Sequence, residues 1–454
     1  MPATDWTYEP GRVFLGLWGR RIYGLKDNRH LVMIAGSRAG KTMTVLVPNL
    51  REYPGPCIVV DPKGELVAKT AARRRTFGPV HILDPFGVTG ESSASHNPLQ
   101  ELKLSPHVAA DAAQLADALI IEPEGSRDSH WTDSARNLIT GLILYLLHTE
   151  KVAAENGTGE TVPVSLERVR RLLSAPAPVM HRMFEAMAKC QDYPDGTMAN
   201  SGSAFLSMFE FNEKGEPVGF TREMVSILST ARQQTAPLDQ VRNVLGGANS
   251  FSLSDISKDN ATVYLVLPAS RIGTHYRWLR LFIMQAFAAV ERNPVDVLGG
   301  KLPIWFVLEE FAALGHIRAI ETAAGYLAGA GIKLWVVLQD LTQLRRHYKE
   351  SWETFLGNAG VTMAFGNVDA TTTQYLSRLL GETTVEDTQR QPTTTHQRDA
   401  GDLGLRSQQV KVPLLTSDEI ALHFSWRTNR ALIYAPGYGR PTYLERYPLP
   451  EAPS

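Results

Sequence analysis

Residues 30–49 constrain the fold of this chain more than any other stretch. The stretch opens with a short apolar run, as a buried strand does, and turns through a loop that contains two glycines. It closes with Lys-Thr at a plausible helix start. A strand, a glycine-containing loop, Lys-Thr and a helix together predict a phosphate-binding loop. The residues predicted to bind nucleotide are Gly36, Ser37, Arg38, Ala39, Gly40, Lys41 and Thr42.

The chemistry of such a loop follows from its backbone. Successive N–H groups and the helix N-terminus point at one spot, which favours an anion. We expect Lys41 to reach the β- and γ-phosphates and the Thr42 hydroxyl to bind Mg²⁺. Ala35 replaces the first glycine of the usual pattern, which is tolerated if its φ stays negative. The alternative is a chance Gly-Lys-Thr at a helix start, and the preceding strand argues against it.

A second motif, at residues 302–310, supplies carboxylates. Its apolar run ends in two acids, which suits a buried strand with carboxylates at its C-terminal edge, where α/β sheets place ligands. We expect Glu309 to help hold Mg²⁺ through water and Glu310 to polarise the attacking water. The alternative is a strand followed by an exposed acidic turn.

The overall composition excludes several classes of protein. Lys and Arg number 46 against 47 Asp and Glu, so any contact with DNA needs a local positive potential. Cys57 and Cys190 are too few and too separated for a disulfide framework or a zinc site, and a reducing compartment fits. The longest apolar run, residues 138–147, is about half the length that crosses a bilayer and predicts a buried core helix.

The order of patterns along the chain predicts the fold class. Strand signals at residues 57–61 and 80–85 alternate with helices, which argues for a parallel, doubly wound sheet. Helical patterns then dominate until strand signals return at 261–268, 302–309, 332–339, 361–367 and 430–436. We therefore predict an α/β, RecA-like P-loop NTPase domain with a predominantly parallel central sheet, interrupted by an inserted all-α domain.

The predicted domains follow from these patterns. Residues 1–29 form an N-terminal β lead-in, residues 30–104 and 239–454 the nucleotide-binding motor domain, and residues 105–238 the all-α insertion. Residues 386–410 lack aromatic side chains and are dense in Thr, Gln, Arg and Asp, which predicts a mobile loop or an extended hairpin.

Several motifs in order resemble those of one family. They are AGSRAGKT (35–42), VVDPKGEL (59–66), HWTDSARNLI (130–139), VLEEFAALG (307–315), VVLQDLTQL (336–344), FGNVDATTTQYLSRLLGETTV (365–385) and PLLTSDEI (413–420). In this order they resemble the type IV secretion coupling proteins, the TraG/TraD-type ATPases of conjugation within the FtsK/HerA group of RecA-like motors.

The resemblance implies a hexameric ring that hydrolyses ATP with Mg²⁺. Such a ring would hand relaxase-bound single-stranded DNA, or protein substrates, to a secretion channel at the inner membrane. It places Lys41 and Thr42 on the phosphate and magnesium positions, and Gln339 on a glutamine near the γ-phosphate. From the residues alone, Gln339 either senses phosphate or satisfies backbone groups at a strand end. Asp61 either orients Lys41 or water, or forms an Asp-Pro turn.

The chain departs from the family pattern in two places. Many members carry an N-terminal transmembrane hairpin, and none is seen here, so we expect a soluble variant or a chain lacking that part; the initial methionine favours a complete chain. Some relatives carry an arginine finger where residues 323–331 here contain no arginine. Arg345, Arg346 and Arg378 are other candidates, and surface solvation explains each at least as well.

Three functions compete. The first is the coupling ATPase, cytoplasmic and peripheral to the inner membrane, a monomer in dilute solution and a homo-hexamer when active. The second is a ring-shaped DNA translocase without a secretion channel, and the third is a non-hydrolysing docking protein.

In the insertion, Trp131 is expected in the core rather than stacked on bases. The run at residues 73–75 is either a solvated basic face or a contact for DNA phosphates.

Overall fold

The computed structural model describes residues 6–102, 107–122, 129–157, 163–193, 196–321, 327–390 and 405–446. The chain divides into two compact units, one made of residues 1–53 and 335–454 and the other of residues 54–334. The two crossings fall after Tyr53 and inside the strand β10 (Ile332–Leu338).

The sheet of the first unit is built around β3 (His30–Ala35). This strand lies between parallel neighbours, β11 (Ala359–Phe365) and the second half of β10, and all of its residues are buried. A strand buried on both faces needs a continuous apolar run, which residues 31–34 supply. Beyond β11 the pairing is antiparallel through β14 (Arg430–Tyr434), β15 (Thr442–Glu445), β1 (Val13–Trp18) and β2 (Arg21–Leu25). The N-terminal β segment thus forms the edge of this sheet.

Short helices connect these strands. The π-helix η2 (Thr42–Leu46) and α1 (Val47–Glu52) follow β3, and α13 (Leu341–Tyr348), η7 (Lys349–Ser351) and α14 (Trp352–Gly357) join β10 to β11. α15 (Ala370–Leu380) follows β11, and α17 (Ser417–His423) and η8 (Trp426–Thr428) lead into β14. A capping box between Thr416 and Glu419 begins α17, so part of the PLLTSDEI motif is a helix-start signal.

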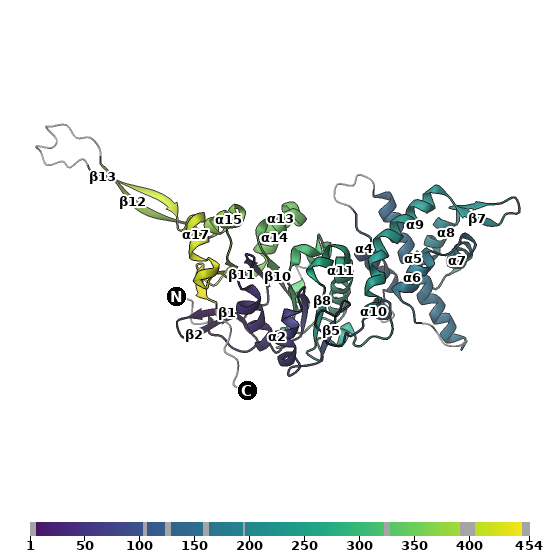
Figure 1. Cartoon of the computed structure of the whole chain (residues 1–454), viewed down its shortest axis with the longest axis horizontal. Coiled ribbons are helices and arrows are strands. Elements are labelled where there is room, and N and C mark those ends of the chain that lie inside the picture. Colours follow the sequence, from purple (N-terminus) through teal and green to yellow (C-terminus); the bar gives the residue numbers. More distant parts are fainter. Residues whose placement is uncertain are drawn as a thin grey trace, which may run out of the picture. The chain divides into compact units, whose positions relative to one another are not determined.

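An antiparallel hairpin leaves the first unit between α15 and α17. It consists of β12 (Glu382–Arg390) and β13 (Leu405–Pro413), and Figure 1 shows it projecting beyond those helices. Of the two alternatives predicted for residues 386–410, the described part is an extended hairpin, and residues 391–404 lie outside the described residues. The side chains of residues 382–389 are exposed, so backbone pairing rather than a buried face holds the strands together.

The sheet of the second unit is entirely parallel. Its strands lie in the order β9 (Ile304–Leu308), β4 (Cys57–Asp61), β8 (Thr262–Val266) and β5 (Val80–Leu83). The helices α2 (Glu65–Arg74), α3 (Pro98–Leu102) and α11 (Ala269–Arg292) belong to the same unit. Short 3₁₀ turns complete it: η4 (Leu253–Asp255), η5 (Phe311–Leu314) and η6 (Leu327–Ala330). The parallel pairings confirm the predicted α/β class.

The three arginines at residues 73–75 differ in their exposure to solvent. Arg74 is fully buried, and its Nε donates to Thr262 Oγ1 at 2.8 Å, so this arginine joins α2 to β8. Arg73 and Arg75 are exposed, and Arg75 pairs with Glu91. Because Arg74 is buried, it cannot contact DNA. Only Arg73 and Arg75 fit the prediction of a solvated basic face.

Most of residues 105–238 form a helical block within the second unit. Its helices are α4 (Val108–Leu119), α5 (His130–Glu155), α6 (Leu166–Leu173), α7 (Ala177–Lys189), α8 (Thr197–Leu206) and α9 (Arg222–Thr235). η3 (Ala236–Val241) and α10 (Arg242–Leu245) follow. α4 packs against both α5 and α11. Among the described residues the only strands of the block, β6 (Phe209–Phe211) and β7 (Pro217–Phe220), pair with each other.

α5 is the core helix of this block. The apolar run at residues 138–147 is buried except for the half-buried Tyr145, as predicted. Gly141 lies where a Cβ atom would come within 2.3 Å of Ser201 Oγ, so its lack of a side chain lets α8 approach α5 closely. Trp131 is half-buried, and its ring lies edge-on to that of His130.

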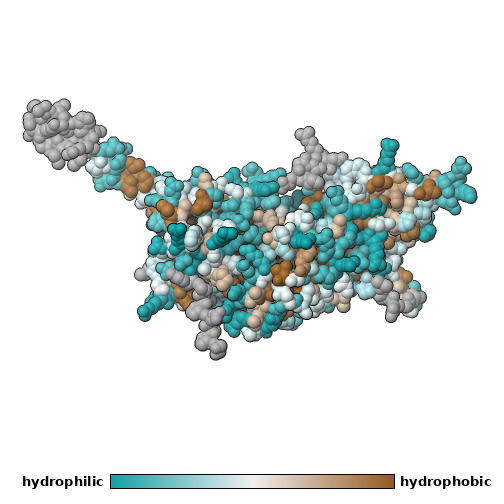
Figure 2. All heavy atoms as spheres, in the orientation of Figure 1, coloured by the Kyte–Doolittle hydropathy of each residue, from teal (hydrophilic) through white to brown (hydrophobic). Residues whose placement is uncertain are grey.

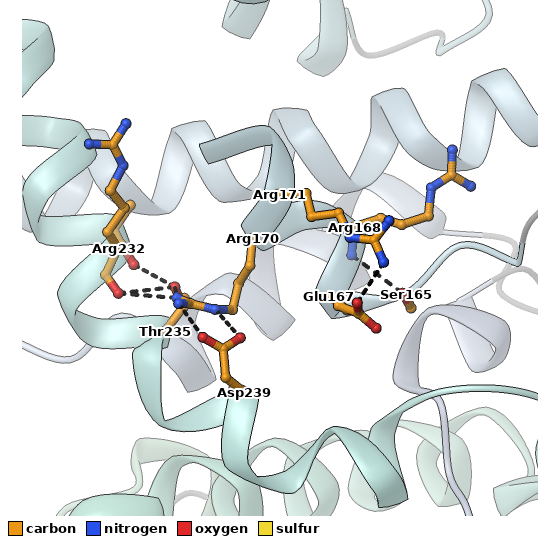
Figure 3. A network of polar contacts seen from close by, with 9 residues as sticks. Ser165, Glu167, Arg168, Arg170, Arg171, Arg232, Thr235 and Asp239 are labelled. Carbon is orange, nitrogen blue, oxygen red and sulfur yellow. Dashed lines mark hydrogen bonds and ion pairs between the residues drawn. The ribbon is translucent and has the colours of Figure 1, made fainter. Parts of the chain in front are cut away.

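The end of the helical block is fixed by Arg170 of α6. Its Nε and Nη2 donate to the two carboxylate oxygens of Asp239 at 2.6 Å each, and its Nη1 donates to Thr235 Oγ1 at 2.8 Å (Figure 3). A bidentate pair of this kind fixes orientation as well as distance. Figure 2 shows a mostly hydrophilic surface with scattered hydrophobic residues. In the β6–β7 hairpin the side chains of Phe211 and Val218 are exposed.

Candidate nucleotide-binding site

The loop between β3 and η2 has the backbone geometry of an anion cradle. Ala35, which replaces the first glycine of the usual pattern, is the last residue of β3 and pairs with Phe365. It therefore has the extended backbone of a strand residue, which alanine adopts readily. Arg38 and Gly40 both have positive φ, at 57° and 88°. Alternating left- and right-handed residues turn successive N–H groups toward one concave face, which binds anions.

Gly36 is required at its position by a close backbone approach. A Cβ atom there would lie 2.0 Å from the carbonyl oxygen of Gly366, and the Gly36 N–H donates to Phe365 O at 3.1 Å. Gly366 itself has a φ of 66°, and a Cβ atom on it would meet that of Ala39 at 2.6 Å. Two glycines therefore hold the loop against the end of β11, and only Gly36 belongs to the predicted phosphate-binding motif.

The helix after the loop starts in an unusual way. Lys41 is half-buried and Thr42 is 8% exposed at the start of the π-helix η2. Pro48 lies in the first turn of α1. It stands where η2 gives way to α1, at a position whose N–H an α-helix does not use. Short π-helices occur frequently at functional sites.

Asn49 ties this helix to the edge of the sheet. Its amide accepts from Phe14 N–H at 2.8 Å and donates to Phe14 O at 2.9 Å, as a neighbouring strand would. Asn49 is 1% exposed, and a buried amide without such partners would be costly.

Arg446 holds the loop in place from inside the first unit. Its Nη1 donates to the carbonyl oxygen of Ala39 at 2.8 Å and to Thr44 Oγ1 at 3.2 Å, and its guanidinium carbon lies 3.9 Å from the centroid of the Phe365 ring. The side chain is 1% exposed, and burial lowers the pKa of Arg446 to about 10. A positive charge buried beside the loop adds to the field that attracts an anion. No sequence signal identified this residue.

Gln339 lies beside the loop by strand register. Leu338 pairs with Ile34, so the next residue of β10 follows the neighbouring strand toward the loop. The Gln339 carbonyl accepts from Asn367 Nδ2 at 3.0 Å, and its N–H donates to Gln343 Oε1 at 3.0 Å. Asn367 is 4% exposed and follows β11, the strand on the other side of β3. The bond between them fixes the two strand ends that flank the loop.

The predicted acids lie in the second unit, at the ends of neighbouring strands. Glu309 follows β9 directly and is 3% exposed, while Asp61 ends β4 and is fully buried. The pairing of Val60 with Leu308 makes Asp61 and Glu309 neighbours along the sheet edge. Burial raises the pKa of Asp61, although backbone N–H groups oppose this shift.

The contacts of Asp61 favour its structural interpretation. Its carboxylate accepts from the N–H of Val67 at 2.8 Å and of Lys63 at 3.3 Å. Both bonds hold the Asp-Pro turn and the start of α2, so the carboxylate stabilises the local backbone of residues 61–67.

Glu310 stands out through its backbone. It has a φ of 56°, in the left-handed region that non-glycine residues rarely adopt, and it precedes η5. Such a conformation costs about 1 to 3 kcal/mol and concentrates at functional sites. The following loop is held by the buried Arg280 of α11, which donates to the carbonyl oxygens of Leu314 and His316.

The predicted site residues fall into two groups, one in each unit. Within the first unit it gathers the loop residues and Gln339, and within the second it gathers Glu309 and Glu310 with Asp61. Arg345, Arg346 and Arg378 are exposed, and the Arg345 guanidinium lies over the Trp352 ring at 5.6 Å. The catalytic roles of all these residues stay predictions.

Comparison with known proteins identifies relatives over most of the chain. A family model described as type IV secretory system conjugative DNA transfer matches residues 7–433. Conjugal transfer protein TraG of Escherichia coli is 30% identical over 410 residues, which cover 86% of this chain and 61% of that protein. Protein VirD4 of Rhizobium rhizogenes is 25% identical over 415 residues, 89% of this chain and 57% of that protein. The chain thus spans about three fifths of the length of these relatives.

Solved structures share the fold. The bacterial conjugative coupling protein TrwBdeltaN70, in a form with sulphate, matches with a TM-score of 0.62 at 15% identity, over 97% of this chain and 90% of that chain. TrwB in complex with ADP and Mg²⁺ matches with a TM-score of 0.59 at 16% identity, over 93% and 86%. These likenesses confirm the predicted fold, a RecA-like P-loop NTPase with a helical domain. Among the described residues, no helix is both long and apolar enough to span a bilayer.

Proposed function

The chain belongs to the type IV secretory system conjugative DNA transfer family, and from this premise we propose that it is an ATP-hydrolysing coupling protein. It recruits relaxase-bound single-stranded DNA, or a protein substrate, and drives its transfer to a secretion channel. The observation that carries the proposal is the loop at residues 36–42, whose backbone is fixed by Gly366 and Arg446 in the form of an anion cradle.

The proposed ligands are ATP and Mg²⁺. The N–H groups of Ser37, Arg38 and Gly40 and the Lys41 ammonium bind the phosphates. The N–H groups of Gly36 and Ala39 donate to Phe365 O and Gly36 O and hold the loop in shape. The buried Thr42 hydroxyl and Glu309 hold Mg²⁺, which neutralises phosphate charge when it is bound. The solved complex of TrwB with ADP and Mg²⁺ supports this choice of ligands.

Hydrolysis is assigned to Glu310 and Gln339. The Glu310 carboxylate polarises the attacking water, and the strained backbone that carries it supports a functional role. The Gln339 amide detects the γ-phosphate, which the register of β10 beside β3 supports. Because Asn367 holds the Gln339 backbone, the amide starts from a fixed strand end.

The proposed organisation follows from these roles. Residues 30–104 and 239–454 act as the motor, with residues 1–29 as its lead-in, and residues 105–238 recognise the partner. The active form is a homo-hexamer, cytoplasmic and peripheral to the inner membrane through contact with channel components. A ring supplies each active site with a charge from the neighbouring subunit, as an arginine finger does.

The test compares nucleotide binding, steady-state ATPase rate with and without single-stranded DNA, and plasmid transfer from a donor that depends on this protein. Lys41→Ala should weaken binding and abolish turnover and transfer. Glu310→Gln should keep binding and abolish turnover and transfer. Lys69→Ala and Glu353→Gln, which change exposed side chains elsewhere, serve as controls.

Two outcomes would contradict the proposal. Near-normal turnover in Glu310→Gln would remove this residue from catalysis. Normal plasmid transfer by a Lys41→Ala protein that no longer binds nucleotide would make the protein a docking scaffold rather than a motor.

A further inference from the structure

Three side chains with metal-binding atoms meet in the helical block. His148 lies on α5, Cys190 caps the C-terminal end of α7, and Asp192 follows two residues later. His148 Nδ1 is 3.1 Å from Asp192 Oδ2, and Cys190 Sγ is 3.9 Å from His148 Nδ1. All three ligand atoms lie within 4.8 Å of one another. The number of cysteines does not predict this cluster, because its other members are Asp192, which is close in the sequence, and His148, which is 42 residues before Cys190.

We propose that His148, Cys190 and Asp192 bind a divalent transition-metal ion of borderline softness, with Zn²⁺ as the best match. Zinc takes thiolate, imidazole and carboxylate ligands at about 2.3, 2.0 and 2.0 Å. In a tetrahedral site these lengths separate sulfur from nitrogen by about 3.6 Å and nitrogen from oxygen by about 3.3 Å. The observed nitrogen–oxygen distance of 3.1 Å is within a few tenths of an ångström of this value. Cys190 Sγ lies 3.9 Å from both ring nitrogens of His148, so rotation of the Cys190 side chain brings the sulfur to the Nδ1 side when the ion binds.

The mixture of donors selects the class of ion. Ca²⁺ and Mg²⁺ prefer sites made of oxygen ligands, so a thiol and an imidazole disfavour them. A site with one sulfur, one nitrogen and one oxygen suits Zn²⁺ and its first-row neighbours. Three protein ligands leave a fourth position for water or for a group from a partner. His148 also lines an open pocket of about 330 Å³ together with Tyr145, Thr149 and Met198, so water can reach this histidine.

The charges around the cluster predict competition with Lys151. Its Nζ lies 3.9 Å from Asp192 Oδ2, the same oxygen that faces His148, and also 3.9 Å from Glu155 Oε1. The lysine side chain is 61% exposed, so it can turn toward Glu155 when a cation arrives. An ammonium near the ligands nevertheless opposes a metal ion, and its removal should strengthen binding.

A metal ion here would fasten the segment after α7 to α5. That segment is otherwise held by the ion pair between His148 and Asp192 and by Tyr193, whose hydroxyl donates to Leu144 O at 3.3 Å. Because an ion binds the folded state, it should stabilise the helical block as its concentration rises above the dissociation constant.

The experiment titrates the metal-stripped full chain with Co²⁺ and Zn²⁺. Tetrahedral Co²⁺ bound by a thiolate gives visible d–d bands and a near-ultraviolet charge-transfer band, and Zn²⁺ should displace it. Cys190→Ser should abolish the charge-transfer band. It should also weaken Zn²⁺ binding by at least about 100-fold, since loss of an outer-sphere partner alone costs up to about that much. Asp192→Asn and His148→Gln should weaken binding similarly, while Lys151→Gln should strengthen it.

Two results would overturn the site. One is a wild-type protein without a thiolate charge-transfer band, and the other is a band of equal intensity in Cys190→Ser, which would assign it to Cys57. Circular dichroism and thermal unfolding of the metal-free variants show whether the block is folded, so lost binding is not confused with lost structure. ATP turnover does not enter this test, which stands or falls independently of the proposed function.

Discussion

Replacing Arg446 with methionine should separate nucleotide binding from stability. The variant removes the bonds from Nη1 to Ala39 O and Thr44 Oγ1, at 2.8 and 3.2 Å, and keeps much of the apolar contact with Phe365. Burying a charge is expensive, so an apolar side chain of similar volume recovers part of what the lost bonds contributed. We therefore expect the free energy of unfolding to fall by no more than about 1 to 2 kcal/mol.

The effect on nucleotide affinity should be larger. A hydrogen bond from a charged donor contributes about 1.5 to 3 kcal/mol to the stability of the conformation that contains it. Without the bond to the Ala39 carbonyl, the loop can leave its binding conformation. If this energy is what keeps the loop organised, ADP affinity falls by about 10- to 150-fold. Arg446→Lys should restore part of the loss, since an ammonium reaches one acceptor but cannot stack as a planar group does.

The assay pairs ADP titration in the presence of Mg²⁺ with urea unfolding in the absence of nucleotide. Arg430→Met is the matched control, because the Arg430 guanidinium lies over the exposed Tyr443 ring in the same pair of strands. An Arg446→Met protein that is folded and binds ADP within about twofold of the wild type would refute the positioning role.

Three further predictions follow from the structure. Gln339→Ala should slow ATP turnover while ADP affinity changes little; an equal loss of both would assign the residue to binding. His96 is buried with a pKa lowered to about 4, so the unfolded state takes up a proton below about pH 6.5 that the folded state refuses. Stability should therefore fall by about 2 kcal/mol between pH 7 and pH 5 in urea unfolding, and His96→Gln should flatten this slope. ATPase rate per subunit, measured with light scattering, should rise with protein concentration as oligomers form, and a rate that stays high where only monomer is present would exclude shared active sites.

The parts that could be predicted from the sequence are those governed by local pattern. The apolar run of β3, the Gly-Lys-Thr after it and the acids after β9 lie where their periodicity and order place them. The role of Gln339 was implied by the family resemblance, and its position directly after an apolar strand left two interpretations open. In each case a few neighbouring residues contain the whole signal.

The parts that were missed depend on contacts between distant residues. Arg446 has no local pattern that distinguishes it from a surface arginine, and only the packing of β15 against β14 brings it to the loop. Gly366 is required by the close approach of β11 to residue 36.

The bond from Arg446 to Ala39 joins residues that are 407 positions apart. During synthesis of the chain this bond can therefore form only long after the loop has been made. A ribosome adds about 5 to 20 residues per second, so the loop is made roughly 20 to 80 seconds before the arginine that braces it. During that interval the nascent protein carries an unbraced loop, which should hold nucleotide weakly. Nucleotide binding should therefore distinguish complete chains from incomplete ones, since only chains extended through residue 446 contain the arginine that holds the loop. Products broken off earlier would be poor competitors for ATP.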